Sequence, residues 1–302
     1  MASKHSISRR SFLKAVGASS AAVAAAGVLS ACGGSSSSTA SSAASTAASA
    51  APATTELAAE QVLNLIYTDL ALIDVNDVRN SNEFEVLTAV QEGLFRTFTD
   101  ENGVDVVENA GCESYDVSDD GLTYTITLRD GLKWSDGTEL NAKDFEYTMK
   151  RIANPDVGAP YGETVVGMIE GYQDAIGNPD KNGKKTTKPD IDKLNVKASE
   201  DGKTLTIKLA YPCSYFDKIV AFGTMSPVQK ATVEKNGDKW ATKPETYVCN
   251  GPYMISEWTP GERIVCKKNP NYKGGWDNSK IVTEQLTFLL LEDSSASYTA
   301  YT

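Results

Sequence analysis

Histidine is nearly absent from this sequence, and its absence excludes several kinds of chemistry. The 302 residues include a single histidine, His5, which lies in an N-terminal segment with the features of an export signal. The rest of the chain lacks the base of Ser-His-Asp and Cys-His nucleophilic sites and the commonest metal ligand. No carboxylates are paired in a way that would support a hydrolase. The sequence argues against an enzyme, and we expect no cofactor and no metal site.

Positive charge is also in short supply. The chain has 29 Lys and Arg against 40 Asp and Glu, a net charge of −11. Four of the positive charges and none of the acids precede residue 32, so a cleaved signal would leave 25 against 40, a net charge of −15. A protein with this negative charge is repelled by nucleic acid and by anionic lipid, so we expect it to bind neither directly.

Cysteines are few, five in all. Cys32 directly follows the signal segment and is treated below. No pair among the other four has the spacing of a zinc ribbon. Cys213 and Cys249 flank loop prolines and glycines, and in an exported protein they could form a disulfide. The sequence leaves the redox state of these four thiols open.

No apolar run is long enough to span a bilayer comfortably. The run Ala15–Leu29 follows basic residues, a pattern typical of a signal peptide, which we assign to residues 1–31. Ser8–Lys14 matches a twin-arginine export pattern, although the general export route stays open.

A lipoprotein box closes the signal. Leu29-Ser30-Ala31-Cys32 has the small residues that admit the peptidase, followed by the cysteine that takes the lipid. Residues 32–59 are dominated by Ser, Ala and Thr, and such a segment stays flexible. We expect a protein tethered to the extracytoplasmic face of the cell membrane through Cys32.

The stretch Glu113–Arg151 is the most informative part of the chain. A polar turn, Ser118–Gly121, precedes a strand in which apolar and polar residues alternate from Leu122 to Arg129, a pattern that predicts a β-hairpin. A helix is expected from Asn141, whose side chain can cap it.

The same hairpin occurs twice. Ser199–Leu209 matches Ser118–Leu128 position by position, 81 residues later. We expect both hairpins in one mixed sheet, although shared turn chemistry alone could explain the likeness.

The rest of the chain alternates between strands and helices. The expected strands are 62–67 and 281–291, with a hairpin over 253–268, and the expected helices are 83–94, 161–176, 211–222 and 227–235. This mixture predicts the α/β class.

The order of motifs resembles a known family. After the first hairpin come Arg129-Asp130-Gly131, Lys133–Gly137 and Ala142–Phe145, without a gap. This block is similar to that of the oligopeptide- and dipeptide-binding proteins, family 5 or cluster C, of ABC-transporter solute-binding proteins. The resemblance implies an α/β chain that forms the first lobe of a two-lobed, periplasmic-binding-protein-like fold with mixed β-sheets and β-hairpins. The second lobe is missing, so the chain looks like the first part of a longer protein.

The resemblance also implies domain boundaries and buried thiols. Residues 60–91 and 230–302 would form one interrupted domain of the first lobe, and residues 92–229 an inserted one. Cys112 and Cys266 match positions where the family has small or apolar residues, which implies that both are buried.

Four residues carry the expected binding site. The stretch from Asp74 to Glu92 keeps the spacing of the family's first binding segment, although Val75 replaces its proline. This match places Arg79, Asn80 and Ser81 where the family pairs with a peptide backbone.

Ala159-Pro160-Tyr161 matches a motif whose tyrosine lines the cleft. A solvent-exposed role for Arg79 and a core role for Tyr161 are the competing interpretations.

The function implied by the resemblance is the capture of oligopeptides outside the membrane and their delivery to ABC permease subunits. Dipeptides, nickel complexes or oligosaccharides are alternative solutes, and a lipid-anchored structural or adhesive module is the rival from another class. We expect a monomer that binds no nucleic acid.

Overall fold

The computed structural model describes residues 59–70, 72–178, 180, 182–184, 186–275, 277 and 280–291. All of them belong to one compact unit. The predicted signal peptide, the predicted lipidation site Cys32 and all but the last residue of the predicted tether lie outside the described residues.

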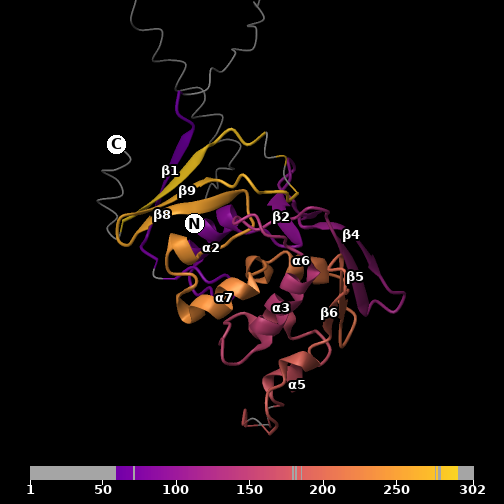
Figure 1. Ribbon diagram of the computed structural model, residues 1–302. Coiled ribbons are helices and arrows are strands. Elements are labelled where there is room, and N and C mark those ends of the chain that lie inside the picture. Colours follow the sequence, from indigo (N-terminus) through magenta and orange to yellow (C-terminus); the bar gives the residue numbers. More distant parts are fainter. Residues whose placement is uncertain are drawn as a thin grey trace, which may run out of the picture. The chain divides into compact units, whose positions relative to one another are not determined.

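The first sheet joins segments from both ends of the described chain, and Figure 1 shows them side by side. Strand β1 (Val62–Tyr67) runs parallel to β10 (Gln285–Leu290). Antiparallel pairing then adds β9 (Arg263–Lys268) and β8 (Tyr253–Thr259). The predicted first strand and hairpin are confirmed, and this sheet is mixed.

The repeated hairpins form a second sheet, in the order β4-β5-β7-β6. Its strands are β4 (Cys112–Val117), β5 (Thr123–Leu128), β6 (Val196–Ala198) and β7 (Thr204–Lys208). The prediction that both hairpins share one sheet is confirmed. The prediction that this sheet is mixed is wrong, because β5 and β7 pair directly and antiparallel, with Tyr124 opposite Ile207. A third, two-stranded sheet consists of β2 (Phe95–Thr99) and β3 (Asp105–Asn109).

The two hairpins share turn chemistry as well as a sheet. The Ser118 hydroxyl donates to Asp120 and the Ser199 hydroxyl to Asp201, both at 2.6 Å. Gly121 follows with φ of +70°, a conformation that favours glycine. The repeat therefore reflects a turn that pre-shapes each hairpin.

The two main helices begin at side-chain caps. Helix α2 (Ser81–Val90) follows Asn80, and α3 (Ala142–Ala153) follows Asn141, whose side chain accepts from the Lys143 amide at 3.0 Å. The cap predicted at Asn141 is confirmed.

The remaining helices are short: α4 (Gly162–Val166), α5 (Tyr172–Ile176), α6 (Phe216–Val220), α7 (Lys230–Asn236), and the 3-10 turns η1 (Ile191–Lys193), η2 (Gly223–Met225), η3 (Gly237–Lys239) and η4 (Pro244–Thr246). The single helix predicted over 161–176 is wrong, because Gly171 adopts a φ of +84° and ends the helical path between α4 and α5. The helix predicted over 211–222 shortens to α6. In the described part of the chain, no helix combines the length and apolarity needed to cross a bilayer.

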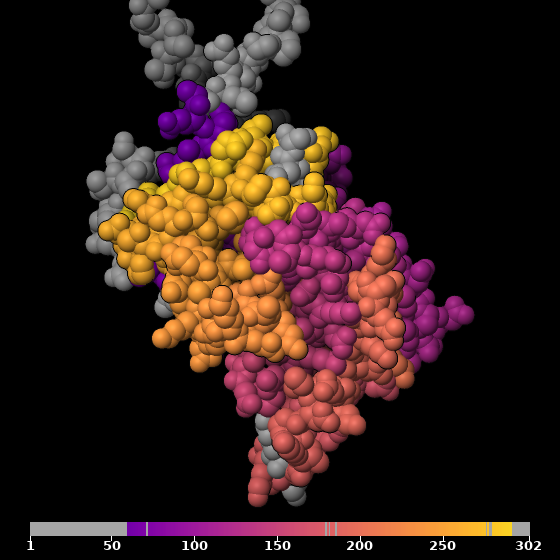
Figure 2. Space-filling view, in the orientation of Figure 1, coloured from indigo at the N-terminus to yellow at the C-terminus, as the bar shows by residue number. Residues whose placement is uncertain are grey.

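Two clusters of buried side chains support these elements. Trp134, Phe145 and Met149 belong to the cluster between α3 and the antiparallel sheet, and Trp240 and Phe288 to the one between α2 and the mixed sheet. Burying each such side chain contributes about 1.5–3 kcal/mol. In Figure 2 the orange segments of the second cluster lie against the magenta segments of the first. The division into an interrupted and an inserted domain stays a prediction.

The candidate disulfide is not formed. Cys213 and Cys249 are both free, buried thiols, as are Cys112 and Cys266. Cys213 lies in the first cluster and Cys249 in the second. Burial raises the pKa of Cys249 to about 12, so its thiol stays protonated and donates to the Tyr253 carbonyl at 3.6 Å.

Candidate functional site

A buried ion pair fixes the segment that leads into α2. The Asp74 carboxylate accepts two bonds from the Arg151 guanidinium, at 3.0 and 2.5 Å, and one from the Trp240 indole at 3.1 Å. Arg151 also lies over the Trp240 ring. Such bidentate pairs are specific in geometry. Asp74 is the first residue of the stretch that matches the family's binding segment. Its role here is structural, because it holds the start of this segment against α3.

Arg79, Asn80 and Ser81 form the entry to α2. The Arg79 side chain is exposed and pairs with Asp77 at 2.7 Å. The backbone amides of Arg79 and Asn80 donate to the Glu83 carboxylate, at 2.6 and 3.2 Å. Ser81 is the first residue of the helix. The two preceding amides are engaged within the chain, so the Ser81 amide becomes the candidate donor to a ligand backbone.

The Tyr161 side chain packs against helix α2. Its ring centroid is 6.1 Å from that of Phe84, one turn after Ser81, and 5.1 Å from that of Phe222. Phe84 and Phe222 are 5.2 Å apart. These three rings, here called the aromatic cluster, join Tyr161 to helix α2, which begins at Ser81. Tyr161 is half-buried and Phe222 is 37% exposed.

A pocket of about 490 Å³ opens beside the aromatic cluster, between α2, β2 and α6. Its apolar wall includes Phe84, Leu87, Phe95, Phe98 and Phe222. We call it the α2–β2 pocket. Its volume lies in the range of small-ligand sites, which are also mostly apolar. Sequence reasoning missed it because Phe98 and Phe222 come from segments far apart in the chain. Phe84 lies within the family-matched stretch, and its place there was the one available signal.

One wall of the α2–β2 pocket is polar and rigid. The buried Glu92 carboxylate accepts from the Tyr272 hydroxyl at 2.5 Å, the Gly275 amide at 3.1 Å and the Arg96 guanidinium at 3.4 Å. Burial raises the pKa of Glu92, and these three partners act in the opposite direction. The Asn250 side chain exchanges two hydrogen bonds with the Glu92 backbone, at 2.8 and 3.1 Å. This wall is therefore held in place before any ligand arrives.

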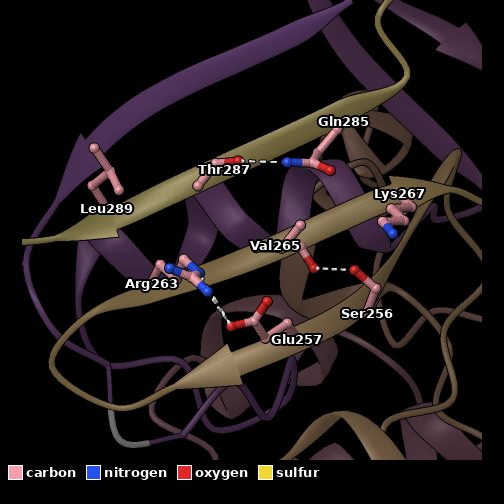
Figure 3. Close-up of a pocket in the computed structure, with 8 residues that line it drawn as sticks. All are labelled: Ser256, Glu257, Arg263, Val265, Lys267, Gln285, Thr287 and Leu289. Atoms are coloured by element: carbon pink, nitrogen blue, oxygen red, sulfur yellow. Dashed lines mark hydrogen bonds and ion pairs between the residues drawn. The ribbon is translucent and has the colours of Figure 1, made fainter.

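A second hollow, of about 410 Å³, lies on the outer face of the mixed sheet (Figure 3). Its polar groups bond to one another. Arg263 pairs with Glu257 at 2.7 Å, and Gln285 donates to the Thr287 hydroxyl at 3.1 Å. The first is an ordinary cross-strand contact between β9 and β8, and the second joins two residues on the same face of β10. Across the described residues, no group of three or more His, Cys, Asp or Glu is arranged to hold a metal ion.

Known proteins are similar to this chain in both sequence and fold. The family model of the bacterial extracellular solute-binding proteins, family 5 Middle, matches residues 107–301. A dipeptide-binding protein of Lactococcus lactis subsp. cremoris is 33% identical over 243 residues, which are 78% of this chain and 40% of that protein. The periplasmic oligopeptide-binding protein OppA of Salmonella typhimurium is 34% identical over 252 residues, 83% of this chain and 43% of that protein.

Solved structures of this kind of protein also match the fold of this chain. The structure of Listeria monocytogenes OppA bound to peptide is 28% identical with a TM-score of 0.69, and the match covers 81% of this chain and 45% of that one. The chain thus spans less than half the length of the relatives it matches, consistent with one lobe of their fold. From its motifs, its fold and these matches, the chain belongs to the family 5 bacterial extracellular solute-binding proteins.

Proposed function

We propose that this chain is the peptide-capturing part of an ABC importer's solute-binding protein, which takes up oligopeptides outside the membrane and delivers them to the permease. One observation carries the proposal: Phe84, one turn after the family-matched segment Arg79–Ser81, packs with Tyr161 in the aromatic cluster, and Phe84 also lines the adjacent pocket. The names of relatives support it, since they bind dipeptides and oligopeptides.

An extended peptide needs backbone partners that do not read its side chains. The Ser81 amide, at the first position of α2, supplies one such donor, and Tyr161 supplies a stacking wall. Water in the open parts of the site accommodates varied side chains. The arrangement suits capture and release without chemistry, which agrees with a protein that is not an enzyme.

We also propose a lipid anchor at Cys32, with the Ser/Ala/Thr-rich segment 32–59 as its tether. A lipid on this cysteine would hold the protein on the extracytoplasmic face, within reach of the permease, because each buried methylene contributes about 0.8 kcal/mol. Cys32→Ala should release the protein from the membrane or leave it unprocessed. Unchanged fractionation and an unchanged N-terminal peptide mass would contradict the anchor.

The function is tested by binding rather than turnover. Isothermal calorimetry and ligand-observed NMR with short peptides, nickel complexes and oligosaccharides should show binding of peptides alone. Binding of nickel complexes or sugars instead would keep the family and change the solute. Binding of none would favour a lipid-anchored structural or adhesive module. Genes for permease subunits and ATPases beside this one would support transport.

Ser81→Pro sharpens the test. Proline is tolerated at the first position of a helix, and the preceding Asn80 is already extended, with φ −125° and ψ 149°. The variant should therefore fold like the parent but lose the donor to the ligand backbone. Ser81→Ala keeps the amide and should bind as the parent does. Equal peptide binding by Ser81→Pro would remove this segment from the site.

A further inference from the structure

The α2–β2 pocket has features that peptide capture through a backbone does not require. Phe98 and Phe222 are 39% and 37% exposed at its wall. Large apolar side chains grouped at a hollow mark a surface that a partner covers. Leu87 and Phe95 continue the apolar lining inward and are both buried. The pocket is thus apolar from its rim to its base on this side.

The pocket is continuous with the proposed peptide site. Phe84 and Phe222 line it and also contact the Tyr161 ring. A peptide that follows Ser81 and Tyr161 would pass the pocket mouth, so one of its side chains could enter. A volume of about 490 Å³ exceeds the space that a single aromatic side chain needs, and ordered water can fill the rest.

The charges at the rim differ in availability. Arg96 is engaged by Glu92 and by Glu108, at 3.4 and 3.2 Å. Lys218 is exposed and lines the pocket, and no ion pair within the described residues includes it. A carboxylate next to the inserted side chain would complement this ammonium group, and a second cation there would be repelled.

We propose that the α2–β2 pocket selects peptides that carry a bulky aromatic residue followed by a carboxylate-bearing residue. The inference rests on the proposed function and adds a substrate class to it. The aromatic ring would pack among Phe84, Phe98 and Phe222, and the carboxylate would face Lys218.

The experiment uses the 302-residue chain and saturation-transfer NMR with four tetrapeptides: Ala-Trp-Glu-Ala, Ala-Trp-Lys-Ala, Ala-Ala-Glu-Ala and Ala-Ala-Ala-Ala. Saturation transfer detects weakly bound ligands, so the low affinity expected of this chain suffices for the readout. The Trp-Glu peptide should bind about tenfold more tightly than Ala-Ala-Glu-Ala, the order expected for an added apolar group in a pocket. It should also bind more tightly than the Trp-Lys peptide.

Phe222→Ala should reduce the preference for tryptophan to within about threefold, since a truncated wall loses most of an apolar pocket's discrimination. Phe98→Ala is an independent variant with the same expectation, and Lys218→Gln should equalise the Glu and Lys peptides. Tyr211→Ala is the matched control, because this aromatic is 56% exposed and lies outside the pocket. All variants should unfold thermally like the parent.

The outcomes separate the two proposals. Equal binding of the Trp-Glu and Ala-Glu peptides would overturn the pocket's role and leave peptide capture standing. Unchanged preference in both Phe222→Ala and Phe98→Ala would also overturn it. Equal binding of the Glu and Lys peptides by the parent would overturn the part assigned to Lys218. Saturation transfer to none of the four peptides would overturn peptide capture together with the pocket.

Discussion

At the scale of single residues, buried charge and backbone conformation both constrain the site. Asp74 and Arg151 are only 8% and 11% exposed in their side chains and form a bidentate pair. Replacing a buried pair can be neutral, whereas removing one partner leaves the other charged and unsolvated. The pair thus couples the segment before α2 to the C-terminal end of α3.

Asp74→Ala should destabilise the protein by about 3–5 kcal/mol, because Arg151 would be left buried without a counter-charge. Urea unfolding monitored by circular dichroism measures the change. Asp130→Ala is the matched control. Its ion pair with Lys203 is 88% and 63% exposed, so its loss should cost about 0–1 kcal/mol. Similar losses in the two variants would refute the structural role of Asp74.

Gly121 is the residue that closes the first hairpin turn. Its φ of +70° strains any β-branched side chain. Gly121→Val should therefore cost about 1 kcal/mol or more in thermal stability, with no effect on ligand preference. Asp119→Val is the control, because it places the same side chain at an exposed turn residue whose φ is not positive. This variant should lose less thermal stability than Gly121→Val. Equal melting temperatures for Gly121→Val and the parent would show that the turn tolerates side chains.

At the scale of elements, helix ends position the side chains that support the candidate site. The Asp144 carboxylate accepts from the Asn141 amide at 3.0 Å and completes the capping box of α3. Helix α3 in turn carries Arg151 near its last turn. The cap that the sequence predicts is therefore linked, through one helix, to the segment that enters α2.

Burial of the Asp144 carboxylate makes stability depend on pH, and the cap hydrogen bond from the Asn141 amide acts against this effect. Burial raises the pKa of Asp144 from its ordinary value of 3.8 to about 6. In that window the native state binds a proton that the unfolded chain releases, so the contribution of Asp144 to stability falls as pH rises from about 4 to 6. Asp144→Asn should flatten the dependence of the unfolding free energy on pH between about 4 and 6. The measurement is the difference in unfolding free energy between variant and parent at each pH.

At the scale of the whole molecule, we expect affinity to depend on closure. The resemblance implies a site between two lobes, and the chain covers 43% of the Salmonella relative. A ligand enclosed on both sides gains contacts and loses water that one lobe alone cannot offer.

We therefore expect the 302-residue chain to bind peptides weakly, at about millimolar dissociation constants. Tyr161→Ala should weaken binding further by about 1–2 kcal/mol when measured on a protein of the relatives' full length, the order expected for a partly buried aromatic. Micromolar binding by the 302-residue chain in calorimetry would contradict the need for closure. Parent-like affinity of Tyr161→Ala would place the cleft wall elsewhere.

The sequence by itself determined the local elements and the family. Period-two alternation, Ser-x-Asp-Gly turns and the Asn141 cap are short-range features, so the hairpins and α3 follow from neighbouring residues. The block from the first hairpin to Phe145 sufficed for the family resemblance. Where local pattern was the only guide, as over 161–176, a helix was expected that Gly171 interrupts.

Tertiary structure alone decided what depends on contacts between distant segments. Strand β5 pairs directly with β7, and Asp74 bonds to Arg151 and Trp240, and each of these contacts joins residues more than thirty positions apart. Packing likewise places Cys213 and Cys249 in different clusters. The α2–β2 pocket likewise needs α2, β2 and α6 at once. A residue pattern records which face of an element is apolar, but the partner of that face is fixed only when the chain packs, because burial is non-directional.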